Sequence, residues 1–194
     1  VYIASPNKLH IEQARVFLEH GKHVICEKPL SAHAKDVAEL QALAKERGLI
    51  YLEAIMFMHL PQRKLLEEAL KKIGDISVAK IDFCQRSSKY DAYLAGSLPN
   101  IFNPALETGA LMDLGVYCVY PALYLFGKPR NTLAVSHLLA SGADGSDIVA
   151  MQYPDKLVNL VFSKVGQAGA NTDFQGTNGT VSVESISKLA NISI

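Results

Sequence analysis

The stretch GKHVICEKPL, residues 21–30, decides the fold of the first part of this chain. Its apolar centre predicts a short buried strand over residues 23–27, because apolar runs bounded by turn residues are typical of such strands. Gly21 marks the end of a preceding helix, since helices often end at a glycine in the left-handed conformation. The charged residue Lys28 lies at the carboxyl end of this strand, and Pro29 follows it at a turn.

The segments on either side of this strand alternate between strand and helix patterns. We expect further strands over residues 1–4 and 49–57, and helices over residues 5–21 and 34–47. Strands and helices that alternate with short links predict βαβ units in a parallel sheet. Residues 1–58 are therefore predicted to form a parallel βαβαβ arrangement, and the fold class is α/β.

Beyond residue 58 the pattern changes to helices followed by many short strands. In order, these are helix 61–73, strand 76–85, a polar loop over 86–108, helix 109–126, and strands near 131–140, 146–153, 157–165, 170–175 and 180–186. Hairpin turns are expected at Asp144-Gly145 and Asn178-Gly179. Residues 59–194 are thus predicted to form an α+β domain with a large open, mostly antiparallel sheet, whose uncovered face is partly buried by another subunit.

Composition narrows the class of protein. The chain has 194 residues, 49% of them hydrophobic, with 19 basic and 19 acidic side chains. This balance does not favour nucleic-acid binding, and a net charge of zero favours self-association. Cysteines at positions 26, 84 and 118 lack C-x-x-C spacing, which argues against a disulfide framework and a zinc ribbon and favours a reducing, cytoplasmic compartment. No apolar run approaches the roughly 18 residues of a membrane span.

Topology alone places a ligand crevice. In open parallel sheets, ligands bind beyond the carboxyl ends of the strands. In this chain those ends are Ser5-Pro6-Asn7, Glu27-Lys28-Pro29 and residues 56–59. We expect these three segments to converge on one crevice.

A second segment, GALMDLGVY over residues 109–117, carries the polar groups best suited to chemistry. Asp113 and Tyr117 are four residues apart, so a helix places them on one face. A cation such as Lys28 beside the phenol would favour the phenolate, which lets tyrosine exchange a proton with an alcohol. The alternative is structural: an aspartate near a helix N-terminus and an amphipathic core tyrosine. We predict no metal site.

These segments together resemble the Gfo/Idh/MocA oxidoreductases. Residues 1–7 look like the family's strand and turn below the nicotinamide, and residues 21–30 are similar to its E-K-P segment. Residues 109–118 look like the branch in which tyrosine transfers the proton, and residues 176–180 are similar to a late hairpin. The resemblance is colinear over nearly the whole chain.

The resemblance implies a function and the residues that perform it. It implies catalytic roles for Lys28 and Tyr117 and substrate binding by Asp113. It also implies contacts with NAD or NADP at one set of residues: Ser5, Pro6, Asn7, Glu27, Lys28 and Pro29. A cis bond before Pro29 is implied as well. The reaction would be hydride transfer at a carbinol of a sugar, polyol or dihydrodiol, in a homodimer or homotetramer.

The chain departs from this family pattern in two places. Glu107-Thr108-Gly109 stands where relatives often have several glycines, and no G-x-G-x-x-G loop is present for the pyrophosphate. We therefore expect residues 1–58 to be the C-terminal half of a dinucleotide-binding domain, the chain to begin inside that domain, and strands to be missing after Ile194. An alternative function is a non-catalytic dimerisation or ligand-sensing module.

Overall fold

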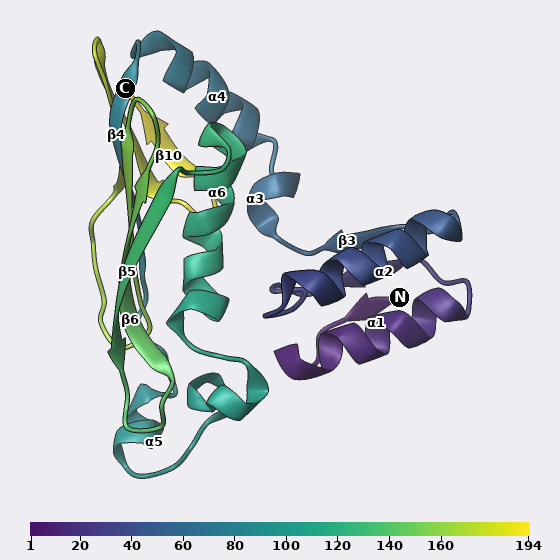
Figure 1. Ribbon diagram of the computed structural model, residues 1–194. Coiled ribbons are helices and arrows are strands. Elements are labelled where there is room, and N and C mark those ends of the chain that lie inside the picture. Colours follow the sequence, from purple (N-terminus) through teal and green to yellow (C-terminus); the bar gives the residue numbers. More distant parts are fainter.

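Two sheets organise the computed structural model, which describes residues 1–194 (Figure 1). The first sheet has three parallel strands in the order β1-β2-β3, which confirms the predicted βαβαβ arrangement. Its elements are β1 (Tyr2–Ile3), η1 (Asn7–Leu9), α1 (His10–Glu19), β2 (Val24–Cys26), α2 (Ala34–Glu46) and β3 (Tyr51–Glu53).

The first sheet has one covered face. Helices α1 and α2 lie side by side and bury Leu18 and Leu40 against Val24 and Cys26 of the central strand (Figure 1). The apolar positions of these helices recur every three or four residues, so each helix has one stripe for this small core.

The second sheet is larger and mixed. Its order is β10-β9-β8-β4-β7-β6-β5, in which only β4 and β7 are parallel, so the predicted mostly antiparallel sheet is confirmed. Its strands are β4 (Ile76–Cys84), β5 (Asn131–Leu138), β6 (Asp144–Gln152), β7 (Leu157–Ser163), β8 (Thr172–Gly176), β9 (Gly179–Ser185) and β10 (Ala190–Ser193). Its helices are α3 (Met56–His59), α4 (Gln62–Lys72), α5 (Tyr90–Leu94), η2 (Asn100–Phe102), η3 (Pro104–Leu106), η4 (Leu111–Gly115) and α6 (Val116–Phe126).

Helices α4 and α6 cover one face of this sheet and form the main core with it (Figure 1). The closest approach is at Gly115, where an added Cβ would lie 2.7 Å from the ring of Phe162 on β7. Because no side chain fits there, glycine allows the helix backbone to rest on the sheet. This close contact fixes the distance between the strands and the helix residues on either side of Gly115.

Several local predictions were wrong. The third strand ends at Glu53, and Met56–His59 form a helical turn instead of its carboxyl end. Asp144-Gly145 begins β6 and is not a hairpin turn. By contrast, the hairpin predicted at Asn178-Gly179 is confirmed, because β8 and β9 pair antiparallel on either side of it. Strand β10 was not predicted; it has only four residues, and its backbone is irregular, with positive φ at Asn191 within it and at Leu189 beside it.

One segment meets the requirements for a membrane-crossing helix. Pro104–Phe126 is long enough and apolar enough to cross a membrane, with a mean hydropathy of 1.4. The core helices of soluble proteins pass the same test, so this finding is weak evidence for a span. The left-handed residue Glu107 interrupts the segment. Ala110, Leu114 and Cys118 are buried in the core beneath the sheet, so this segment packs as a core helix.

Candidate active site between the two sheets

Lys28 joins the two sheets at the carboxyl end of β2. Its Nζ lies 2.7 Å from the backbone oxygen of Asp113 and 2.7 Å from Oδ1 of the same residue. Only 13% of the Lys28 side chain is exposed. The Lys28–Pro29 bond is cis, as the resemblance implied. The structure thus brings together two site residues that the sequence placed in separate halves of the chain.

Asp113 lies in a wide helical turn. The sequence predicted one regular helix over residues 109–126, but Leu111–Gly115 form a π-turn in which the Val116 amide donates to the carbonyl of Leu111. Such turns insert one residue into a helix and often occur at functional sites. Here Asp113 directs both its carbonyl and its carboxylate toward Lys28.

Tyr117 also lies beside Lys28. The centre of its ring is 5.1 Å from Lys28 Nζ, and Phe83 of β4 packs edge-on against it at 5.6 Å between ring centres. The Tyr117 hydroxyl makes no hydrogen bond within the chain, so it is available to a ligand. Lys28, Asp113 and Tyr117 therefore form one cluster.

The electrostatics of Tyr117 correct one expectation. Burial, followed by the negative charges of Glu27 and Asp113, raises the pKa of Tyr117 above its ordinary value. Lys28 was expected to have the opposite effect. The ammonium lies against the ring and donates to Asp113, so its charge is directed at the carboxylate rather than at the phenol oxygen.

A second lysine, Lys164, completes the cluster and was missed by the sequence analysis. It follows β7, is 4% exposed, and its Nζ donates to Asp113 Oδ2. Burial favours a protonated carboxyl, but the ammonium groups of Lys28 and Lys164 hold the pKa of Asp113 below its usual range. The predicted strand over 157–165 hid Lys164 inside an element, whereas the true strand ends at Ser163. A charge directly after an apolar strand, the signal that identified Lys28, applies equally to Lys164.

The predicted coenzyme residues lie in the two turns after β1 and β2. Ser5 Oγ donates to Gln13 at 2.8 Å, and Asn7 Nδ2 donates to the backbone oxygen of Glu107 at 2.8 Å. Glu27 accepts from the Tyr2 hydroxyl and from the Lys28 amide. Pro6 immediately precedes the η1 turn. Asn7 thereby links the small sheet to the loop that precedes η4 and α6.

His10 holds these two turns together and was also missed. Its Nδ1 lies 2.8 Å from the carbonyl oxygen of Pro29, and its Nε2 lies 2.9 Å from that of Ser5. The side chain is fully buried. A single histidine in an amphipathic helix carries no sequence signal for this bridging role.

The end of β3 does not join the cluster as predicted. His59 is exposed and its Nε2 lies 3.1 Å from the carbonyl oxygen of Glu53, which agrees with a structural histidine. Instead, Glu53 accepts from the Leu30 amide and from the Tyr120 hydroxyl. It ties the turn after Pro29 to helix α6.

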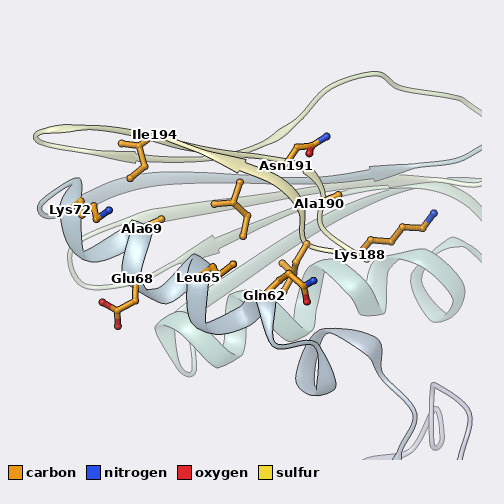
Figure 2. A pocket seen from close by; sticks show the side chains of 11 residues that line it. Gln62, Leu65, Glu68, Ala69, Lys72, Lys188, Ala190, Asn191 and Ile194 are labelled. Carbon is orange, nitrogen blue, oxygen red and sulfur yellow. The ribbon is translucent and has the colours of Figure 1, made fainter.

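A separate groove of about 580 Å³ lies between α4 and the last strand, and its side chains come from both segments (Figure 2). Leu65 and Ala69 of α4 line one side, and Ala190 and Ile194 line the other. It contains none of the clustered residues.

Comparison with known proteins places this geometry in a family. Residues 1–55 match the "Oxidoreductase family, NAD-binding Rossmann fold", and residues 63–182 match the "GFO/IDH/MocA C-terminal domain". The chain belongs to the Gfo/Idh/MocA oxidoreductase family. The α/β fold with a Rossmann-like first part agrees with solved Gfo/Idh/MocA structures.

Two relatives illustrate the range of this family. Over 194 residues the Gfo/Idh/MocA chain is 42% identical to scyllo-inositol 2-dehydrogenase (NADP(+)) IolU of Bacillus subtilis, and the match covers 100% of this chain and 59% of that protein. It is 30% identical over 190 residues to the mouse trans-1,2-dihydrobenzene-1,2-diol dehydrogenase, a match that covers 95% of this chain and 55% of that one. The chain thus spans little more than half the length of these relatives.

A solved structure is similar over the same extent. The 3-ketoreductase KijD10 of Actinomadura kijaniata, crystallised with NADP and TDP-benzene, has a TM-score of 0.84 at 27% identity. The similarity covers 96% of this chain and 57% of that one. The relative placement of the two sheets is therefore shared with a coenzyme-bound family member.

Proposed function

We propose that the protein is an NAD(P)-dependent oxidoreductase that transfers hydride between nicotinamide and a carbinol of a sugar, polyol or dihydrodiol. The observation that carries this proposal is the cluster of Lys28, Asp113 and Tyr117 beside the carboxyl ends of parallel strands. A phenol with a free hydroxyl next to an ammonium group can exchange a proton with an alcohol.

The two turns fit the nicotinamide end of a coenzyme. The parallel strands β1 and β2 end side by side, and His10 fixes the two turns that follow them. When bound, NAD or NADP would accept or donate the hydride. The residues expected to contact it are those predicted from the resemblance: Ser5, Pro6, Asn7, Glu27, Lys28 and Pro29.

Each clustered residue has a distinct role in the proposed reaction. During oxidation Tyr117 takes the proton of the substrate hydroxyl as the phenolate, and during reduction it returns the proton as the phenol. Lys28 donates a hydrogen bond to the reacting oxygen and stabilises the charge that develops there. Asp113 orients Lys28 and accepts from a neighbouring substrate hydroxyl, since 30% of its side chain remains exposed.

The named relatives support this substrate class. IolU is named for scyllo-inositol, which is a polyol, and the mouse protein is named for a dihydrodiol. In each case the oxidised group is a secondary carbinol with a neighbouring hydroxyl, which suits the pair Tyr117 and Asp113.

A second candidate function is a non-catalytic dimerisation or ligand-sensing module. The large sheet favours assembly, because its outer strands leave Leu133, Val135 and Ile148 more than half exposed. We propose a homodimer or homotetramer through this face.

A cytoplasmic location is supported by three free thiols. Two separate hydrophobic clusters support division into domains over residues 1–58 and 59–194.

Coenzyme titration separates the two functions. The purified chain, and any longer product of the same gene, would be titrated with NADH and NADPH while nicotinamide fluorescence is recorded. Saturable binding, followed by coenzyme reduction with scyllo-inositol or a trans-dihydrodiol, is the expected result. If the longest product neither binds coenzyme nor reduces it, the oxidoreductase proposal is wrong and the binding module is favoured.

A further inference from the structure

Lys164 is a buried lysine whose side chain has a single partner. Its side chain is 5% exposed. Its ammonium donates a hydrogen bond to Asp113 Oδ2 and to no other side chain. The backbone around it is fixed, because its amide donates to the Gly145 carbonyl at 2.8 Å and its carbonyl accepts from Ser87 at 2.7 Å. A buried charge is costly unless it is paired, so this position requires a carboxylate at residue 113.

Asp113 is shared between two ammonium groups. Lys28 holds Oδ1 and Lys164 holds Oδ2, so the three groups together carry one net positive charge. Glu27 is the other carboxylate whose charge acts on Tyr117. On the neighbouring strand β6, Asp144 bonds to the Leu111 amide and neither it nor Asp147 forms an ion pair with Lys164.

This arrangement determines what Lys28 can do. Without Lys164, the charge of Lys28 would be cancelled by Asp113, and Glu27 would leave a net negative charge around the phenol. A negative charge opposes phenolate formation. With Lys164 present, a second ammonium group balances the carboxylate charge, and its bond to Oδ2 restrains rotation of Oδ1 away from Lys28.

We infer that Lys164 is a positioning residue that holds Asp113 through Oδ2 and compensates its charge, which leaves Lys28 available to the reacting oxygen. The inference rests on the proposed hydride-transfer function. Lys164 itself does not contact substrate in this arrangement, since only 5% of its side chain is exposed and its ammonium is bonded to Asp113. It acts through Asp113 on Lys28.

The test compares Lys164→Met with Lys164→Arg in the longest product of the gene. Lys164→Met should lower kcat for alcohol oxidation about tenfold or more and move the rise of kcat/KM with pH upward by about one unit, because phenolate formation becomes harder. The KM for coenzyme should stay unchanged. Lys164→Arg should recover most of the activity, since a guanidinium also binds a carboxylate oxygen.

Lys156→Met is the matched control. Lys156 is a largely covered lysine, 16% exposed, that pairs with Asp155 outside the site. It should leave kcat and the pH profile unchanged. A wild-type pH profile in Lys164→Met, or equal losses in the two methionine variants, would overturn the inference.

A spectroscopic readout separates this inference from the proposed function. In the ¹⁵N-labelled chain without coenzyme, the ammonium signals of Lys28 and Lys164 should both be protected from exchange with water. Asp113→Asn should weaken the protection of Lys164, whose ammonium has no other partner, whereas Lys28 keeps its bond to the backbone oxygen of residue 113. Protection of Lys164 that is unaffected by Asp113→Asn would disprove the shared carboxylate, even if Lys164→Met does not fold. If these signals behave as expected but no coenzyme is reduced, only the hydride-transfer proposal fails.

Discussion

The ammonium of Lys28 lies 2.7 Å from Oδ1 of Asp113, although 85 residues separate the two in sequence. One residue lies in the turn after β2 of the small sheet, and the other lies in a helix that rests on the large sheet. The site is therefore a property of how the two sheets meet, and its parts can be tested one at a time.

Replacement of Tyr117 tests the proposed proton transfer. Tyr117→Phe keeps the ring against Phe83 but removes the hydroxyl, so kcat with a polyol or dihydrodiol should fall by about 10²–10⁴ while the protein stays folded. Steady-state kinetics measure this effect. Tyr124→Phe, which removes a hydroxyl bonded to Glu67 outside the cluster, should have little effect. Nearly normal turnover of Tyr117→Phe would rule out the role.

Asp113 should make stability depend on pH in the acid range. Because its pKa in the folded protein lies below the usual value of 3.8, ionised Asp113 stabilises the fold above that value. The contribution is lost as the pH falls through the folded pKa. Asp113→Asn should therefore cost about 1–3 kcal/mol near neutral pH, and the difference from wild type should shrink below about pH 4. Urea denaturation at several pH values measures both quantities. A difference that is constant from pH 3 to 7 would contradict this assignment.

The bridge made by His10 should matter for coenzyme binding. His10→Ala removes the contacts with the carbonyl groups of Ser5 and Pro29, so the two turns lose their common support. We expect the Kd for NADH or NADPH to rise about tenfold. Fluorescence titration gives the Kd. His20→Ala serves as the control, because His20 is exposed and contacts only its own helix at Val16. Equal affinities for the two variants would show that the bridge does not shape the coenzyme site.

Gly115 should tolerate no side chain. Gly115→Ala places a methyl group 2.7 Å from the Phe162 ring, so the helix must move away from the sheet. Overpacking of this kind costs about 1–3 kcal/mol. Thermal or urea unfolding would detect the loss. Gly169→Ala, where an added Cβ has nothing within 4 Å, should be neutral. Activity of Gly115→Ala should fall as well, because Asp113 belongs to the same turn.

The sequence is most informative where a simple periodicity meets a change of residue type. Lys28 could be predicted as a site residue because a charge directly follows an apolar strand at a sheet edge where ligands bind. The strand predicted over residues 76–85 likewise corresponds to β4. These features depend on neighbours within a few positions, so the local pattern is sufficient.

The parts that could not be predicted depend on contacts between distant segments. A π-turn and an α-helix share the same apolar pattern, so the geometry of Asp113 was not visible in residues 109–117. Lys164 was hidden by an error of two residues in the end of β7, and its partner lies 51 residues away. The role of His10 depends on two backbone carbonyls, which no side-chain pattern encodes.

The bond between Lys28 and Asp113 has a further consequence for the catalytic cycle. A hydrogen bond is lost once its atoms separate by about one ångström, so even a slight parting of the two sheets dismantles the cluster. A ligand that widened the gap between the two sheets would therefore separate Lys28 from Asp113. The bond thus couples the spacing of the two sheets to the geometry of the cluster.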